Sequence, residues 1–98
     1  MQVHGIADVK HAGPATLAQI EPLLRDIRSH AALRERTPGS FYLKSKGYLH
    51  FHEDPAGVFA DVKLDLREFT RLRATTAKEQ RALLTLIAKS LVTLKPRG

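Results

Sequence analysis

Cysteine and tryptophan are absent from this chain of 98 residues, and methionine occurs only once. Without cysteine there is no disulfide framework, thiolate zinc site, cysteine nucleophile or iron–sulfur cluster. No apolar run approaches the ~20 residues that a membrane-spanning helix needs. The opening stretch Met1–Gly5 lacks the basic region and apolar segment of a signal peptide. We therefore expect a cytoplasmic protein with a single, modest core.

Enzyme signatures are also missing. No G-x-S-x-G pattern surrounds any serine, and no glycine-rich phosphate loop ends in Lys-Ser or Lys-Thr. Among the carboxylates, Asp54 is explained by a turn, and Glu53 and Asp61 need no role beyond solubility. We expect a protein that is not an enzyme and has no intrinsic cofactor.

Positive charge is in excess. The chain carries 16 lysine and arginine residues against 10 aspartate and glutamate residues, which gives a formal net charge of +6. Such an excess attracts nucleic acids and other polyanions. The charges are spread from Lys10 to Arg97, without the block of ~5–6 like charges that marks a basic tail.

Two helices are predicted, one in each half of the chain. The stretch Thr16–Gln19 fits a capping box and apolar residues follow at helical spacing, so the first helix is expected over 16–31. Pro22 conflicts with this, because proline removes a hydrogen bond inside a helix. The helix therefore either kinks there or begins near Pro22. A second capping box, Thr76–Glu79, starts a helix that ends before Pro96.

Between the helices the apolar period changes to two, which is typical of strands. The predicted strands are Ser40–Ser45, Tyr48–His52, Val58–Leu64 and, more weakly, Phe69–Arg73. The short turns between these strands, Lys46-Gly47 and Asp54–Gly57, favour an antiparallel meander of three to four strands. We predict an α+β fold in which both helices cover one face of the sheet. Residues 1–13 are expected to be a weakly ordered lead-in, and residues 14–98 one domain.

The segment around His50 and His52 is the densest group of reactive side chains. Two residues apart on a strand, these histidines point to one side, and Asp61 on the next strand is a further candidate metal ligand. Zinc usually takes three or four protein ligands, so a pair of histidines specifies little. The alternative, which the sequence favours, is two half-exposed strand residues opposite core-facing Leu49 and Phe51.

The same side of the predicted sheet also carries cations and aromatic rings. Aromatic rings beside cations on an open sheet can stack bases and hold phosphates. The candidate nucleic-acid or anion-binding residues are Lys44, Lys63, Arg71, Arg73, Tyr42 and Tyr48. The alternative is a solvated face whose aromatic residues make cross-strand pairs.

The stretch Pro38–Tyr42 and the segment Leu49–Val62 resemble a group of small bacterial proteins of unknown function. Their shared pattern is F-H-E-D-x-x-G-x-x-A-D-V, a hairpin between two helices, and the resemblance covers about 16–94. More distantly, the helix–meander–helix order is similar to the YjbR-like family, which implies an α+β fold and a DNA-binding role. Fold analogy does not transfer function, and neither group supplies a catalytic residue.

The leading hypothesis is a small binding or regulatory module whose basic sheet face meets an acidic partner such as nucleic acid. One alternative is a small-ligand or metal-binding domain that uses His50, His52 and Asp61. Another is an interaction module, monomer or weak homodimer, that closes uncovered apolar area by self-association.

Overall fold

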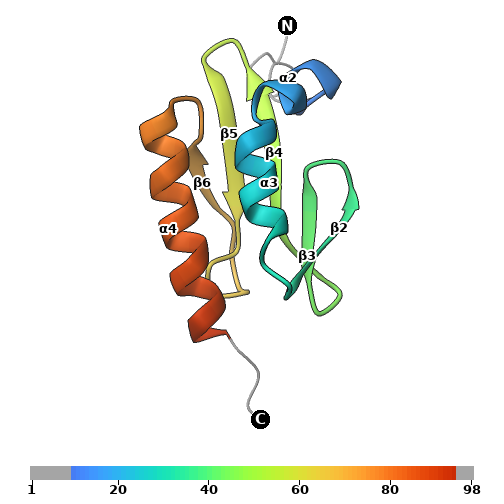
Figure 1. Cartoon of the computed structure of the whole chain (residues 1–98), viewed down its shortest axis with the longest axis vertical. Helices are drawn as coiled ribbons and strands as arrows, with labels where there is room; N and C mark the ends of the chain where they lie inside the picture. The colour runs from blue at the N-terminus through green and yellow to red at the C-terminus, as the bar shows by residue number, and fades with distance from the viewer. Residues whose placement is uncertain (1–9, 95–98) are drawn as a thin grey trace, which may run out of the picture.

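A computed structural model of the chain describes residues 10–94 (Figure 1). The α+β class and the antiparallel sheet are confirmed. Residues 1–9 of the expected lead-in, and the predicted helix end at Pro96, lie outside the described residues. Along the chain the elements are β1 (Lys10–His11), α2 (Pro14–Gln19), α3 (Glu21–Arg28), β2 (Leu33–Thr37), β3 (Ser40–Leu43), β4 (Lys46–Asp54), β5 (Gly57–Val62), β6 (Thr70–Arg73) and α4 (Ala77–Thr93).

Within residues 10–94 the sheet has six strands, where the sequence predicted three to four. Five of them run in the order β2-β3-β4-β5-β6, each antiparallel to the next, and β1 pairs with β4. The sequence does not indicate β2, because its central residues, Arg34, Glu35 and Arg36, are all charged. Nor does it indicate β1, which has two residues and falls in the expected lead-in.

The first predicted helix is in fact two helices, α2 and α3, which meet at Ile20. Pro22 lies in the first turn of α3, where its missing N–H has no intrahelical partner to lose. The expected capping box at Thr16 does not form, because α2 begins after Gly13. The Gly13 N–H donates instead to Glu53 Oε1 on β4, at 2.8 Å.

The second capping box is confirmed. The Thr76 hydroxyl accepts a hydrogen bond from the Glu79 backbone N–H, and the Glu79 carboxylate accepts one from the Thr76 N–H. These two backbone donors at the start of α4 are therefore satisfied. None of the helices in residues 10–94 is both long and apolar enough to cross a membrane.

The core lies between α3, α4 and the sheet. Figure 1 shows the two helices side by side in front of the strands. Full burial of one large apolar side chain contributes about 1.5–3 kcal/mol, so the core residues dominate stability. The predicted core positions of Leu49 and Phe51 are confirmed, and Phe41 and Leu43 of β3 are buried with them. Other core residues are Leu24 and Ile27 from α3, Leu83 and Ile87 from α4, and Ala60 and Val62 from β5.

Tyr48 departs from the predicted alternation. Phe41 pairs with Leu49 and Tyr42 pairs with Gly47, so Tyr48 is the extra residue of a β-bulge in β4. Tyr48 and Leu49 are consequently both buried, and the Tyr48 hydroxyl donates to Ser90 Oγ on α4 at 2.8 Å. The prediction that Tyr48 belongs to an exposed binding surface is wrong.

Candidate metal centre on the open face

On one side of the sheet, the residues of β4, β5 and β6 form two rows. His50, Asp61 and Arg71 lie directly opposite one another on neighbouring strands. His52, Phe59 and Arg73 form the next row. Because successive strand residues point to opposite sides, both rows lie on the side of the sheet away from Leu49, Phe51, Ala60 and Val62. We call the side that carries these two rows the open face.

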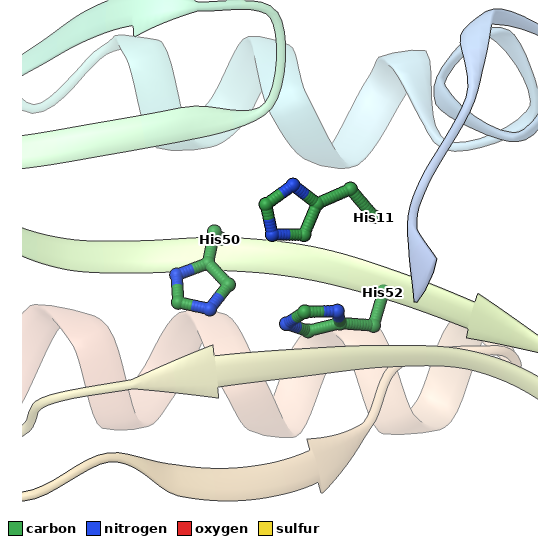
Figure 2. Close-up of side chains that lie close together, drawn as sticks. All are labelled: His11, His50 and His52. Carbon is green, nitrogen blue, oxygen red and sulfur yellow. The ribbon is translucent and has the colours of Figure 1, made fainter. Parts of the chain in front are cut away.

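Three imidazole rings gather on the open face. His50 and His52 come from β4, and His11 comes from β1, where it pairs directly with His52. One ligand nitrogen from each ring lies within 4.8 Å of those of the other two. Figure 2 shows the three rings turned toward one another beside β4. The pairing of β1 with β4 therefore completes a group that β4 begins.

Asp61 is the carboxylate that faces two of these rings. Its Oδ2 atom lies 3.0 Å from His52 Nε2 and 3.5 Å from His50 Nε2. Arg71 donates to both carboxylate oxygens, from Nε to Oδ1 and from Nη2 to Oδ2, each at 2.8 Å. A bidentate pair of this kind fixes the plane of the carboxylate. The group that orients the histidines is thus itself held in place.

The electrostatics of this site favour neutral imidazoles beside an ionised carboxylate. Burial lowers the pKa of His50 and of His52 below the usual histidine value, although Asp61 opposes the shift. Burial alone raises the pKa of Asp61, but the hydrogen bond and charge of Arg71, with smaller effects of the histidines, lower it overall. Metals bind the neutral form of imidazole.

One nitrogen of His52 is without a hydrogen-bond partner. Its Nδ1 atom is buried, and within residues 10–94 no hydrogen bond of good geometry reaches it, although the Lys10 backbone has a minor effect that raises the pKa of the ring. When the neutral ring donates its Nε2–H to Asp61, Nδ1 carries an unshared lone pair. Leaving such a buried atom unsatisfied costs about 1–3 kcal/mol. Metal-binding histidines commonly donate one ring N–H to a carboxylate and use the other nitrogen as the ligand.

The cluster is reachable from solvent on the His11 side. His11 is exposed, whereas the side chains of His50 and His52 are 25% and 12% exposed. Imidazole ligands suit zinc, copper and nickel ions. Zinc–nitrogen bonds are ~2.0–2.1 Å long, so the rings have to move closer together around an ion, and the exposed His11 side chain has room to rotate toward the other two. The arrangement can therefore supply three protein ligands to one ion.

Several of the residues predicted to bind nucleic acid are not free to do so. Arg71 is bound to Asp61, and Arg73 donates to Glu79 Oε2 at 3.1 Å and to the Ala56 carbonyl at 3.1 Å. Both guanidinium groups therefore already compensate a carboxylate, which reduces the charge they offer to a phosphate. Tyr48 is buried, as described above.

Tyr42 and Lys63 each take part in a cation–aromatic pair. The Arg36 guanidinium carbon lies 4.6 Å from the centre of the Tyr42 ring. Lys63 Nζ lies 4.7 Å from the centre of the Phe69 ring, which packs edge-on against His50 with ring centres 4.8 Å apart. Lys44 is exposed in the turn between β3 and β4, with a φ of 52°.

His11 is the site residue that sequence reasoning does not single out. The structure brings His50, His52 and Asp61 together, and His11 joins them from a distant part of the chain. No spacing motif links His11 to β4, because the contact depends on a cross-strand pair between distant segments. The only signal in the sequence is an additional histidine close to the first helix.

Comparison with protein-family models, curated proteins and solved structures finds no match to this chain. The resemblance to small bacterial proteins with the F-H-E-D hairpin, and the more distant one to the YjbR-like family, therefore stay predictions. The functional inference rests on the residues themselves.

Proposed function

We propose that this protein is a metal-binding module whose longer helices cover one face of the sheet, while His11, His50 and His52 bind a zinc-class divalent ion on the other. The observation that carries the proposal is the convergence of three imidazole nitrogens within 4.8 Å. Three histidines are a sufficient protein ligand set for zinc. The module is proposed to act by binding and not as an enzyme.

Asp61 has a supporting role in this proposal. Through its contacts with His50 and His52 it holds the two rings of β4 in place, and Arg71 in turn holds Asp61. Outer groups of this kind orient metal ligands, and their loss typically lowers metal affinity about 10–100-fold. The proposed ligand set thus differs from the sequence hypothesis: the third ligand is His11, where the hypothesis has Asp61.

The test is a zinc titration of the tag-free chain near pH 7.5, in competition with a chromophoric chelator. The wild-type protein should bind one equivalent, and His11→Ala should weaken binding at least tenfold. His11 is exposed, so this variant should keep the fold, which circular dichroism would check. His30→Ala is the matched control, because His30 lies outside the cluster and should leave affinity unchanged. No binding by wild type, or equal binding by His11→Ala, would overturn the proposal.

A second candidate function is nucleic-acid binding by the open face. The observation in its favour is the set of three cation–aromatic pairs, Arg36–Tyr42, Lys63–Phe69 and Arg73–Phe59. Aromatic rings can stack on bases while the neighbouring cations hold phosphates. Within residues 10–94 neither Arg36 nor Lys63 forms an ion pair with a carboxylate, so these two carry the available charge.

Fluorescence anisotropy with short single-stranded DNA and RNA tests this candidate. Binding should be micromolar and should weaken as salt rises, because phosphate contacts release counterions. Arg36→Glu combined with Lys63→Glu should weaken it about equally for unrelated sequences and make the salt dependence shallower. Reversing Arg25 and Lys89, which are exposed on α3 and α4, is the control. Absence of salt-sensitive binding by the wild-type protein removes this candidate.

A further inference from the structure

We propose that the metal ion at His11, His50 and His52 takes a phosphate group as its fourth ligand, with Lys63 as the charged partner of that group. This inference rests on the proposed metal site and names the class of ligand for it. Three observations carry it: the number of protein ligands, the balance of charge around them, and the position of Lys63.

The number of ligands leaves one coordination position to an outside group. Zinc with three protein ligands keeps a fourth position for water or a substrate atom. Asp61 is poorly placed to take this position, because Arg71 donates to both of its oxygens and His52 lies 3.0 Å from one of them. The exposed side of the cluster, at His11, is where an external ligand can approach.

The charge balance around the cluster favours an anion in that position. Three neutral imidazoles leave both charges of a divalent ion uncompensated. Asp61 is the carboxylate in contact with the rings, and the guanidinium of Arg71 already neutralises it. A bound metal ion is often the largest charge in a site, so it sets the sign of the ligand that completes the site. An anion in the fourth position would compensate part of this charge, which a neutral water would not.

Lys63 supplies the second positive charge and the reason for choosing phosphate. Its ammonium lies over the Phe69 ring, and the same ring packs edge-on against His50, so Lys63 and His50 share one aromatic neighbour. Within residues 10–94 it forms no ion pair. A terminal phosphate group has several oxygens and about two negative charges near neutral pH, so it can bind the ion with one oxygen and a lysine with another.

The experiment uses the full chain loaded with one equivalent of cobalt(II), whose visible absorption reports its ligands. Inorganic phosphate, phenyl phosphate, a dinucleotide with one phosphodiester, and acetate are titrated separately into the loaded and the metal-free protein. Phosphate and phenyl phosphate should change the cobalt spectrum and broaden the phosphorus-31 resonance of the ligand. The metal-free protein should bind phosphate and phenyl phosphate at least tenfold more weakly than the loaded protein does. Acetate and the diester should bind the loaded protein more weakly than phosphate does.

Variants locate the contact. Lys63→Ala should weaken phosphate binding about tenfold, the expected loss for one charge-assisted hydrogen bond, and leave cobalt affinity unchanged. Lys89→Ala is the matched control, because Lys89 is an exposed lysine on α4. Equal binding of acetate and phosphate, or equal phosphate affinity in wild type and Lys63→Ala, would overturn this inference and leave the metal site standing. Failure to bind cobalt and zinc would overturn both.

Discussion

The two sides of β4 differ in what holds their residues in place. Leu49 and Phe51, on what we call the covered side, are buried in the core cluster with residues of α3 and α4 and are held by apolar packing. His50 and His52, which alternate with them, are held by a carboxylate, by a neighbouring strand and by one another. Apolar packing is non-directional, whereas hydrogen bonds fix orientation. The covered side therefore contributes most of the stability, and the contacts on the open face orient the histidine rings.

The largest expected effect is on the covered side. Phe51→Ala should lower the free energy of unfolding by about 3–5 kcal/mol, because it leaves a cavity in the core. His50→Ala, one residue earlier on the open face, should cost about 1 kcal/mol. Urea denaturation of the two variants measures this difference. Similar losses of unfolding free energy in both variants would mean that the covered side does not contribute more stability than the open face.

Removal of a charge partner on the open face should have a smaller effect. Arg71→Ala leaves Asp61, whose side chain is only 12% exposed, without its two strongest hydrogen bonds. The free energy of unfolding should fall by about 1–3 kcal/mol. The double variant Arg71→Ala with Asp61→Asn should recover part of this loss, because no buried charge is then left unpaired. Additive losses in thermal melts would argue against a coupled pair.

Tyr48 tests a polar contact on the covered side. Its hydroxyl donates to Ser90 Oγ, which in turn donates to the Leu64 carbonyl at 2.6 Å. Tyr48→Phe keeps the ring and removes one hydrogen bond, so the expected loss is about 1 kcal/mol. Zinc affinity should be unchanged, because Tyr48 points away from the histidines. A changed zinc affinity in this variant would show that the two sides are coupled.

The smallest effect concerns pH and an ion pair outside the cluster. The hydrogen bonds from Arg28 lower the pKa of Glu35 below the ordinary value of 4.5, although burial opposes them. The unfolded state then binds more protons, so stability is present above about pH 4.5 and is lost as pH falls through the lowered pKa. In Glu35→Gln the free energy of unfolding should fall less steeply between about pH 5 and pH 3 than it does in the wild type. Urea denaturation at intervals of about 0.5 pH measures this slope. An unchanged slope would mean that the pair contributes nothing.

The sequence predicted those parts of the fold that depend on local patterns. The strands around Phe41, Phe51 and Ala60 and the capping box at Thr76 follow from spacing within a few residues, and the structure confirms them. The failures depend on contacts between distant segments. The bulge that buries Tyr48 is set by the β3–β4 register, and α2 begins before Thr16, directly after Gly13, whose N–H donates to the distant Glu53.

The candidate site shows the same division. His50 and His52 share a face because they are two apart on one strand, which the sequence reveals. His11 reaches them through the pairing of β1 with β4, which no local pattern encodes. Likewise, the sequence does not show that Asp61 and Glu79 lie beside Arg71 and Arg73, so it predicts two free guanidinium groups where the structure has ion pairs.

The most direct test of the metal centre is imidazole nitrogen-15 NMR of the tag-free protein during addition of one equivalent of zinc. Metal coordination changes the nitrogen-15 chemical shift of the ring nitrogen that acts as the ligand, so the spectrum shows separately which histidines bind the metal. The ring resonances of His11, His50 and His52 should all move to new positions at one equivalent, and those of His30 should not. If His11 keeps its resonances while the other two move, or if none of the three moves, the three-histidine centre is contradicted.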